Sequence, residues 1–195
     1  MALLDWINET TGPVVKGEGV TLRPPRNADH EAWAALRLTS HAYLQRWEPS
    51  WPEDDLTRAA YRRRLSIYAR EMEAGNAWPF FILDDDQTLV GAITLSNVRR
   101  GVAETGTLGY WIGQPFAGLG LGTAAVRAMV GYAFDELKLH RVEAACVPGN
   151  AASRRVLEKA GFVLEGQARA YLKINGAWAD HLLFGVVNDG AGRGG

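Results

Sequence analysis

Residues 108–123 read Leu-Gly-Tyr-Trp-Ile-Gly-Gln-Pro-Phe-Ala-Gly-Leu-Gly-Leu-Gly-Thr, an apolar strand pattern that runs into a glycine-rich turn and then into a helix. The three glycines of the turn stand at alternate positions: Gly118, Gly120 and Gly122. Glycine has no Cβ, so the backbone can bring its N–H groups close against an anion. The helix expected over about 121–137 adds unpaired first-turn N–H groups and a partial positive charge, and Thr123 adds a hydroxyl. This stretch predicts a cradle for a pyrophosphate group.

The position of the turn in the chain excludes two common kinds of nucleotide site. A dinucleotide-binding fold places its glycine turn after the first strand, with an acidic residue about 20 positions further on. Here several strand-like segments come before the turn. A Walker-type loop needs a lysine directly before its Ser or Thr, but Gly122 precedes Thr123. A different phosphate ligand is therefore expected.

The composition indicates one globular domain, residues 1–195, with its core at about 20–187. The chain has 195 residues, of which 47% are hydrophobic and 22% charged, enough to bury a sizeable core. An N-terminal arm and a glycine-rich C-terminal tail flank that core. The formal net charge of −1, without a long basic block, argues against nucleic-acid binding and favours a small-molecule or peptide partner.

The lone cysteine, Cys146, excludes an intramolecular disulfide and favours a reducing, intracellular setting. The N-terminus lacks the pattern of a signal peptide, and no apolar run reaches the roughly 20 residues needed to cross a bilayer. We therefore expect a cytoplasmic protein without a membrane segment, either monomer or homodimer. The acidic triplet at 84–86 is better explained as a hairpin turn than as a metal site, so no metal is expected.

Hydrophobic periodicity and turn residues predict a mixed α/β sheet of about seven mostly antiparallel strands, flanked by about four helices. One parallel crossover surrounds the glycine turn. Helices are expected from Asn27 or Asp29 to about Thr39, and over 54–75, 121–137 and 150–160. Strands are expected at 20–23, 78–83, 88–95, 106–112, 141–147, 162–171 and 178–187.

This element order, with a glycine turn after the fourth strand and an Asn at the next helix start, resembles the GNAT superfamily of acetyl-CoA-dependent N-acyltransferases. The family signature at the turn is Gln or Arg, two variable residues, Gly, one variable residue, then Gly or Ala. The matching positions here are Ala117, Gly120 and Gly122. Ala117 departs from the pattern. Because backbone N–H groups make most phosphate contacts in this motif, the departure removes one polar contact worth about 1 kcal/mol.

Within the superfamily, six segments resemble the RimJ/RimL branch, the ribosomal-protein-alanine N-acetyltransferases, and RimJ in particular. They are residues 44–49, 95–101, 108–113, 150–153, 160–162 with 165–166, and 171–181. The resemblance implies acetyl-CoA as cofactor and an amine as acceptor. The residues implied to bind the cofactor are Tyr110, Trp111, Ile112, Gly118, Leu119, Gly120, Leu121, Gly122, Thr123 and Asn150.

Transfer of an acyl group from a thioester to an amine needs a stabilised oxyanion and a proton for the departing thiolate. The strand 110–113 is expected to splay from the strand 141–147, which leaves a backbone N–H near Ile112 free for the thioester oxygen. Asn150 is either a helix N-cap or a cofactor contact, and both roles can hold. Ser153 is either a surface serine or the thiol's proton donor. Many GNAT enzymes place a tyrosine seven residues after the asparagine, but Leu157 stands there, which favours Ser153.

A neutral acceptor amine is also required, and two carboxylates are candidates for binding or deprotonating it. Glu48 is the first choice and Glu104, before the fourth strand, the second; for each, the alternative is a solvated loop carboxylate. Trp47, Tyr171 and His181 are candidates for lining the acceptor groove. Cys146 lies on an apolar strand without a neighbouring His motif, so an acyl-cysteine route is not expected.

These expectations converge on an acetyl-CoA-dependent N-acetyltransferase that acts by direct attack in a ternary complex. The leading acceptor is a protein N-terminal α-amine, such as Ala or Ser of a ribosomal protein. One alternative is an enzyme that acetylates an aminoglycoside or another small amine, which a carboxylate-lined pocket would favour. The other is a non-catalytic acyl-CoA-binding or ribosome-assembly module, to which Ala117 gives limited support.

Overall fold

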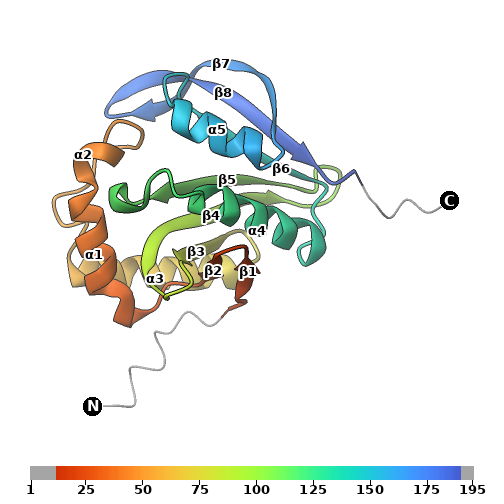
Figure 1. Cartoon of the computed structure of the whole chain (residues 1–195). Coiled ribbons are helices and arrows are strands. Elements are labelled where there is room, and N and C mark those ends of the chain that lie inside the picture. Colours follow the sequence, from red (N-terminus) through yellow and green to blue (C-terminus); the bar gives the residue numbers. More distant parts are fainter. Residues whose placement is uncertain (1–11, 190–195) are drawn as a thin grey trace.

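The computed structural model describes residues 12–189, so the start of the expected N-terminal arm and the glycine-rich tail lie outside the described residues. One eight-stranded sheet forms the centre of the protein, in the order β1-β2-β3-β4-β5-β6-β8-β7 (Figure 1). Its strands are β1 (Val15–Gly17), β2 (Val20–Arg23), β3 (Trp78–Leu83), β4 (Leu89–Arg99), β5 (Thr105–Ile112), β6 (Arg141–Cys146), β7 (Val163–Ile174) and β8 (Ala177–Val187). Only β5 and β6 pair in parallel, so the predicted mixed and mostly antiparallel sheet is confirmed.

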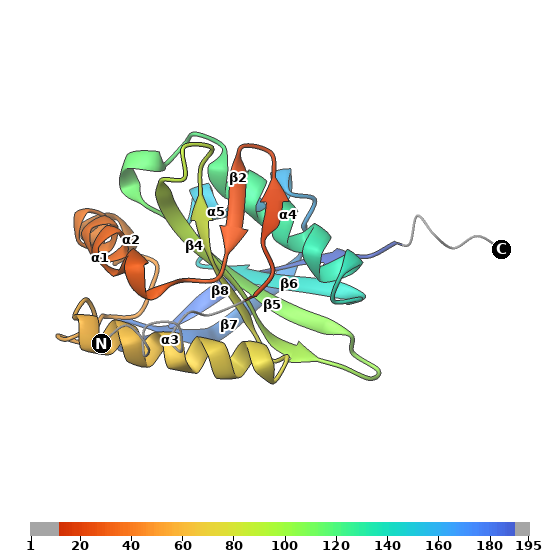
Figure 2. The same ribbon diagram turned by 90° about the horizontal axis from the view of Figure 1, so that it is seen from below.

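Helices cover both faces of this sheet. They are α1 (His30–Thr39), α2 (His41–Leu44), α3 (Arg58–Glu73), α4 (Leu121–Asp135) and α5 (Ala151–Lys159). Figure 2 shows α3 on one side of the sheet and α4 on the other, with α1 and α2 at one end. No helix of the described residues is long and apolar enough to span a bilayer.

Burial follows the same division into two faces. β3 is buried along its whole length, as expected of a central strand covered on both sides. The larger apolar cluster packs α4 against the sheet around Phe80, Ile93 and Met129, and includes Cys146. A second cluster packs α1 and α3 on the opposite face around Trp33 and Tyr61. Cys146 therefore lies in the core.

The sequence-based expectation of about seven strands and four helices falls one short in each class. The extra strand, β1, pairs only with β2. Because β1 has three residues, it is too short for an alternating pattern to reveal it in the sequence. The extra helix, α2, has four residues, about one turn. Both short elements belong to stretches that the sequence left without regular structure.

The connection from β5 through α4 to β6 creates the opening that becomes the site. β5 pairs with β6 from Thr105↔Arg141 to Leu108↔Ala144 and no further. Beyond Leu108, β5 stays paired with β4 as far as Ile112, while β6 stays paired with β8 as far as Cys146. The two parallel strands therefore diverge at their carboxyl ends, as predicted.

The β7–β8 hairpin reaches across to the segment that follows α2. Its two-residue turn, Asn175–Gly176, has positive φ at both positions, 49° and 83°, as a type I′ turn requires. The Asn175 Nδ2 donates to the Gln45 carbonyl at 2.9 Å, and the Ser50 hydroxyl donates to Asn175 Oδ1 at 2.9 Å. The hairpin tip is thereby joined to residues 45–50, some 125 to 130 positions away in the sequence.

Candidate active site

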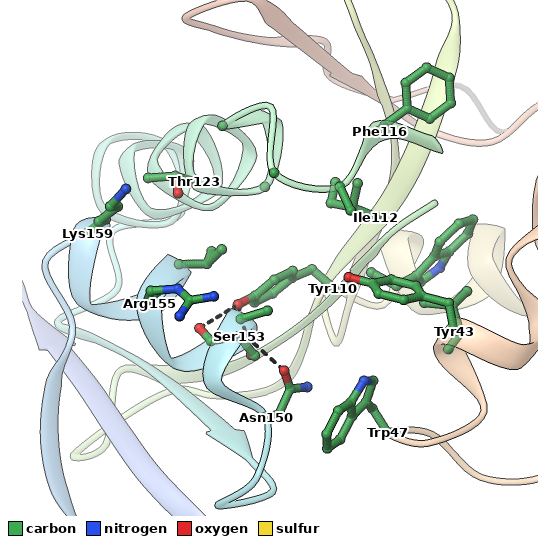
Figure 3. A pocket seen from close by; sticks show the side chains of 18 of the residues that line it. Tyr43, Trp47, Tyr110, Ile112, Phe116, Thr123, Asn150, Ser153, Arg155 and Lys159 are labelled. Atoms are coloured by element: carbon green, nitrogen blue, oxygen red, sulfur yellow. Dashed lines mark hydrogen bonds between the residues drawn. The ribbon is translucent and has the colours of Figure 1, made fainter. Parts of the chain in front are cut away.

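A pocket of about 360 Å³ lies at the divergence of β5 and β6. Its volume falls in the ordinary range for a small-molecule site. In Figure 3, Thr123 and Lys159 lie toward one end of the pocket, Tyr110 and Ser153 lie in the middle, and Tyr43 and Trp47 lie toward the other end. The lining residues come from α2, the segment after it, β5, the glycine turn, α4 and α5: Tyr43, Leu44, Trp47, Glu48, Tyr110, Trp111, Ile112, Phe116, Ala117, Gly118, Gly120, Gly122, Thr123, Asn150, Ala152, Ser153, Arg155, Val156 and Lys159.

The glycine turn has the backbone conformation that its sequence indicates. Gly118 and Gly120 have φ of 82° and 86°, in the left-handed region that side chains other than glycine rarely adopt. Gly120 is also the N-cap of α4. A Cβ on Gly122 would stand 3.3 Å from Ile112 Cγ1, so this glycine lets α4 lie close to the end of β5.

Positive charge gathers at the same end of the pocket. The α4 helix brings its N-terminus, with unpaired first-turn N–H groups and a partial positive charge, to the wall of the pocket. From α5, Arg155 and Lys159 line the pocket one helical turn apart. Backbone donors and two cations on one wall suit a phosphate-bearing ligand.

Ser153 is fixed from two sides in the middle of the pocket (Figure 3). Its backbone N–H donates to Asn150 Oδ1 at 3.0 Å, so Asn150 is the N-cap of α5, as expected. Its hydroxyl lies 3.0 Å from the Tyr110 hydroxyl, which also donates to the Ser153 carbonyl at 3.2 Å. Burial raises the pKa of the Tyr110 phenol above its ordinary value, so this hydroxyl stays protonated at neutral pH.

The end of β5 presents backbone N–H groups to the opening. The N–H of Gly113 donates to the Val90 carbonyl at 2.8 Å, toward β4. Because N–H directions alternate along a strand, the N–H of Ile112 faces the other way, toward the side from which β6 has diverged. This is the N–H expected to bind an oxyanion.

Glu48 lines the other end of the pocket, near Trp47. Its two oxygens accept from different partners: Oε2 from Arg37 Nη1 at 3.0 Å and Oε1 from Trp51 Nε1 at 2.7 Å. The structure therefore brings the first-choice carboxylate into the same pocket as Ser153 and the glycine turn. It also shows that this carboxylate is held rather than solvated.

The structure does not bring Glu104 to this pocket. It lies at the amino end of β5, 3.6 Å from Arg100 in an ion pair, whereas the pocket lies at the carboxyl end. An eight-residue strand spans roughly 25 Å, which is too far for Glu104 to reach the same amine. Glu104 is therefore not placed to act on an acceptor in this pocket.

Four other expected residues lie outside the pocket lining. Tyr171 and His181 contact each other on the β7–β8 hairpin, with ring centroids 5.7 Å apart, and His181 is buried with Nδ1 donating to the Ala179 carbonyl at 3.0 Å. Leu119 is exposed within the glycine turn, and the side chain of Leu121 packs against the main apolar cluster. These two leucines contribute backbone rather than side chain to the turn.

The pattern of residues 20–163 matches the family described as Acetyltransferase (GNAT) domain. The chain belongs to the GNAT acetyltransferase family. Among its relatives, the probable N-acetyltransferase YjcK of Bacillus subtilis is 37% identical over 176 residues, which cover 90% of this chain and 97% of YjcK. The [ribosomal protein uS5]-alanine N-acetyltransferase of Escherichia coli is 34% identical over 158 residues, covering 80% of this chain and 81% of the relative.

Solved structures of GNAT proteins agree with this fold. The ribosomal-protein-S5-alanine acetyltransferase of Vibrio fischeri has a TM-score of 0.84 at 30% identity, covering 92% of this chain and 98% of its own. Mycobacterium smegmatis RimJ, solved in complex with CoA-disulfide, has a TM-score of 0.83 at 34% identity, covering 90% and 86%. The expectations of a GNAT fold and of an acetyltransferase of the RimJ/RimL type are confirmed.

Several residues of this GNAT site were not predicted from the sequence. The pocket lining includes Tyr43, Phe116, Arg155 and Lys159. Outside the lining, Arg37 donates a hydrogen bond to Glu48. For Arg155 and Lys159 a signal was present, because positions 152, 155, 156 and 159 share one face of a helix whose N-cap had been recognised. Arg37 gave no such signal, since its contact depends on the packing of α1 against the segment after α2. Within residues 12–189, no group of His, Cys, Asp and Glu side chains is arranged to hold a metal ion.

Proposed function

We propose that this GNAT protein transfers an acetyl group from acetyl-CoA to the N-terminal α-amine of a protein, by direct attack in a ternary complex. The leading acceptor is a cytoplasmic ribosomal protein that starts with Ala or Ser. The observation that carries the proposal is the order of groups along one pocket: phosphate-binding groups at the glycine turn, Tyr110 and Ser153 in the middle, and Glu48 at the far end.

The comparisons support both halves of the proposal. The E. coli relative at 34% identity is named for alanine N-acetylation of ribosomal protein uS5. The M. smegmatis RimJ structure, also 34% identical, contains a CoA-disulfide. We transfer the cofactor and the class of acceptor from these relatives to this chain.

The residues present fit a CoA ligand. Gly118 and Gly120 adopt positive φ, and a Cβ on Gly122 would lie in tight contact with Ile112. We assign the backbone N–H groups of the turn and of the α4 N-terminus to the pyrophosphate, with Arg155 and Lys159 as further cations for phosphate. Ala117 offers no side-chain donor at the position where the family signature has Gln or Arg.

Acetyl-CoA supplies the acetyl group as an activated thioester. The free N–H of Ile112 is assigned the role of oxyanion donor, because a fixed N–H stabilises charge that develops on a carbonyl oxygen during attack. Direct attack is favoured over an acyl-enzyme route. Cys146 is buried and its thiol pKa is raised by that burial, so it does not supply a thiolate nucleophile at neutral pH.

We assign proton donation to the departing thiolate to Ser153. Its hydroxyl is hydrogen-bonded to that of Tyr110 at 3.0 Å, which orients it, and the proton that Ser153 gives to the thiolate is replaced from solvent. Asn150 holds Ser153 in place through the backbone and, within the described residues, has no partner for its Nδ2, which faces the pocket.

An α-amine is the acceptor that needs least help from this site. With a pKa near 7.8, roughly a quarter of it is neutral at pH 7.4, against about 0.1% of a lysine side chain. Among the pocket-lining residues Glu48 is the only carboxylate, whereas a site for polycationic aminoglycosides is expected to have several. One carboxylate matches one ammonium group.

The test is CoA release from acetyl-CoA with three kinds of acceptor: a short peptide that starts with Ala, its N-blocked copy containing lysine, and an aminoglycoside panel. Release with only the free α-amine is the expected result. Activity with only aminoglycosides would assign the protein to the small-amine class instead. Tight CoA binding without transfer to any amine would favour the non-catalytic module.

A further inference from the structure

Arg37 is a buried cation directly behind the acceptor end of the pocket. Its side chain comes from α1, and the whole residue is 7% exposed. The guanidinium lies between two indole rings, 3.9 Å from the centroid of Trp51 and 5.0 Å from that of Trp111. Such contacts stabilise a cation electrostatically and also limit where it can move.

Glu48 is the carboxylate that forms an ion pair with this guanidinium within residues 12–189. The Arg37 Nη1 donates to Glu48 Oε2 at 3.0 Å. The Arg37 Nε is buried and has no hydrogen-bond partner in the described part of the chain. A buried guanidinium with one anion and an unpaired N–H depends on that anion, so the position of Glu48 and that of Arg37 are coupled.

Glu48 is held at both oxygens yet remains open to the pocket. Trp51 Nε1 donates to Oε1 at 2.7 Å, on the other side from Arg37. The side chain of Glu48 is 23% exposed and lines the pocket. Each carboxylate oxygen has two lone pairs, so one on each remains for a ligand. These lone pairs suit a cationic donor.

A second arginine, Arg64, also pairs with a carboxylate beside an indole ring. This closed triad of Arg64, Asp55 and Trp33 does not line the pocket. Arg64 donates to Asp55 Oδ1 at 2.5 Å and lies 4.8 Å from the ring centroid of Trp33. Asp55 is 8% exposed and does not line the pocket. Each arginine pairs with a carboxylate beside an indole ring, and of these two carboxylates only Glu48 lines the pocket.

We propose that Arg37 is a positioning residue for the acceptor: held between Trp51 and Trp111, it fixes Glu48 as an anion that binds the acceptor's ammonium group. The inference rests on the proposed function and refines the role of Glu48. A carboxylate shared with a guanidinium binds the ammonium form, and the amine loses its proton to solvent, as an α-amine can near neutral pH. Arg37 itself touches neither acceptor nor acetyl group.

The experiment compares Arg37→Met, Arg37→Lys, Glu48→Gln and the double variant Arg37→Met with Glu48→Gln in steady-state kinetics. The acceptor is a short peptide that starts with Ala. Arg37→Met and Glu48→Gln are each expected to raise the KM for peptide about tenfold, the loss of one charge-assisted hydrogen bond. The KM for acetyl-CoA stays within about twofold of the wild type, since the phosphate end is untouched.

The double variant separates positioning from a merely structural role. If Arg37 acts through Glu48, removing it from the Glu48→Gln protein raises the peptide KM by no more than about a further twofold. Arg37→Lys, which keeps the charge, is expected to recover part of the loss. The matched control is Arg64→Met, which breaks the closed triad and is expected to lower Tm without changing either KM.

Three results would overturn the proposal: a peptide KM within twofold of wild type for Arg37→Met, losses that multiply in the double variant, or a parallel rise in the KM for acetyl-CoA. If Arg37→Met does not fold, the peptide KM of Arg37→Lys is compared with that of Glu48→Gln instead. A wild type that acetylates another amine and not the peptide contradicts only the proposed function, and the same variants are then run on that amine. If no amine is acetylated, peptide binding is measured by calorimetry in the presence of CoA, and equal affinity for wild type and Arg37→Met rejects the proposal.

Discussion

Ser153 is oriented from two sides by the protein itself, because Asn150 caps its N–H and Tyr110 contacts its hydroxyl. Replacing it by Ala removes the hydroxyl and leaves the cap intact. We expect kcat to fall about 100-fold, the lower range for loss of a general acid, with the KM for acetyl-CoA little changed. Rapid-quench measurement of a single turnover shows whether the chemical step is the one that slows.

Tyr110→Phe is the companion variant to Ser153→Ala. The pKa of Tyr110 is raised by burial, so no loss of activity from ionisation of this phenol is expected as pH rises toward 10. Removing its hydroxyl is expected to lower kcat less than Ser153→Ala does, because Ser153 remains. Full turnover by Ser153→Ala under conditions where chemistry limits the rate would exclude the general-acid role.

At the scale of single residues, sequence reasoning succeeded where a local pattern decides the position. Asn150 and Ser153 were identified because an N-cap and the residue three positions later occupy one end of one helix. Glu48 was identified through its segment, but its partner Arg37 was not, because their contact depends on tertiary packing across 11 positions. Glu104 lies far from the pocket because it stands before the first residue of β5, whereas the opening is at the carboxyl end of that strand.

At the scale of elements, the glycine turn and α4 form one unit. Gly120 has φ of 86° and caps α4, so an Asp there combines backbone strain with a negative charge at the expected pyrophosphate position. We expect Gly120→Asp to weaken acetyl-CoA binding at least 100-fold, about 3 kcal/mol, measured by isothermal titration calorimetry. The charge, and not strain alone, makes the effect large.

Gly101→Asp is the matched control for Gly120→Asp. Gly101 also has a positive φ, 70°, with open space around the position of a Cβ, but it lies in the β4–β5 connection and does not line the pocket. This variant is expected to lower stability and to leave acetyl-CoA affinity unchanged. Unchanged affinity for Gly120→Asp would instead show that the turn does not bind phosphate.

The tip of the β7–β8 hairpin is a second element beside the site, because Asn175 joins it to the segment that contains Glu48. Asn175→Gly keeps the positive φ of 49° favourable and removes both side-chain hydrogen bonds to that segment. We expect the peptide KM to rise roughly fivefold, with faster amide hydrogen exchange at residues 45–50.

Gln87→Gly is the matched control for this hairpin variant. Gln87 has φ of 62° in the β3–β4 turn, and its side chain makes only a 3.4 Å hydrogen bond to the Asp84 carbonyl. Its replacement is expected to change neither the peptide KM nor exchange at residues 45–50. If both variants behave alike, the effect of Asn175→Gly comes from the turn backbone and not from the contact with residues 45–50.

Elements with strong periodicity and clear ends were the predictable part of the fold. β3, β6, α4 and α5 were placed to within about two residues, because buried apolar runs and glycine or asparagine ends mark them. β7 and β8 were predicted shorter than they are. Both β7 register shifts, and the exposure of most of its residues, weaken the alternation that reveals a strand.

At the scale of the whole molecule, the pocket connects the two sides of the sheet. Phe116 lines the pocket and packs against both apolar clusters, and the remaining walls come from α2, the segment after it, β5, the glycine turn, α4 and α5. A ligand that touches all of these elements stabilises the folded state as a unit. At 100 times its dissociation constant, acetyl-CoA should add about 2.7 kcal/mol, which raises Tm by roughly 5–10 °C in a protein of this size.

Differential scanning calorimetry with and without acetyl-CoA tests this coupling. A single transition that moves as a whole is expected, because the ligand bridges both clusters. Gly120→Asp should shift by no more than about 1–2 °C at the same acetyl-CoA concentration, whereas Gly101→Asp should start from a lower Tm and shift by the wild-type amount. Two transitions, of which only one moves, would mean that the part containing Trp33 and Tyr61 unfolds independently and that the pocket is completed from only one side of the sheet.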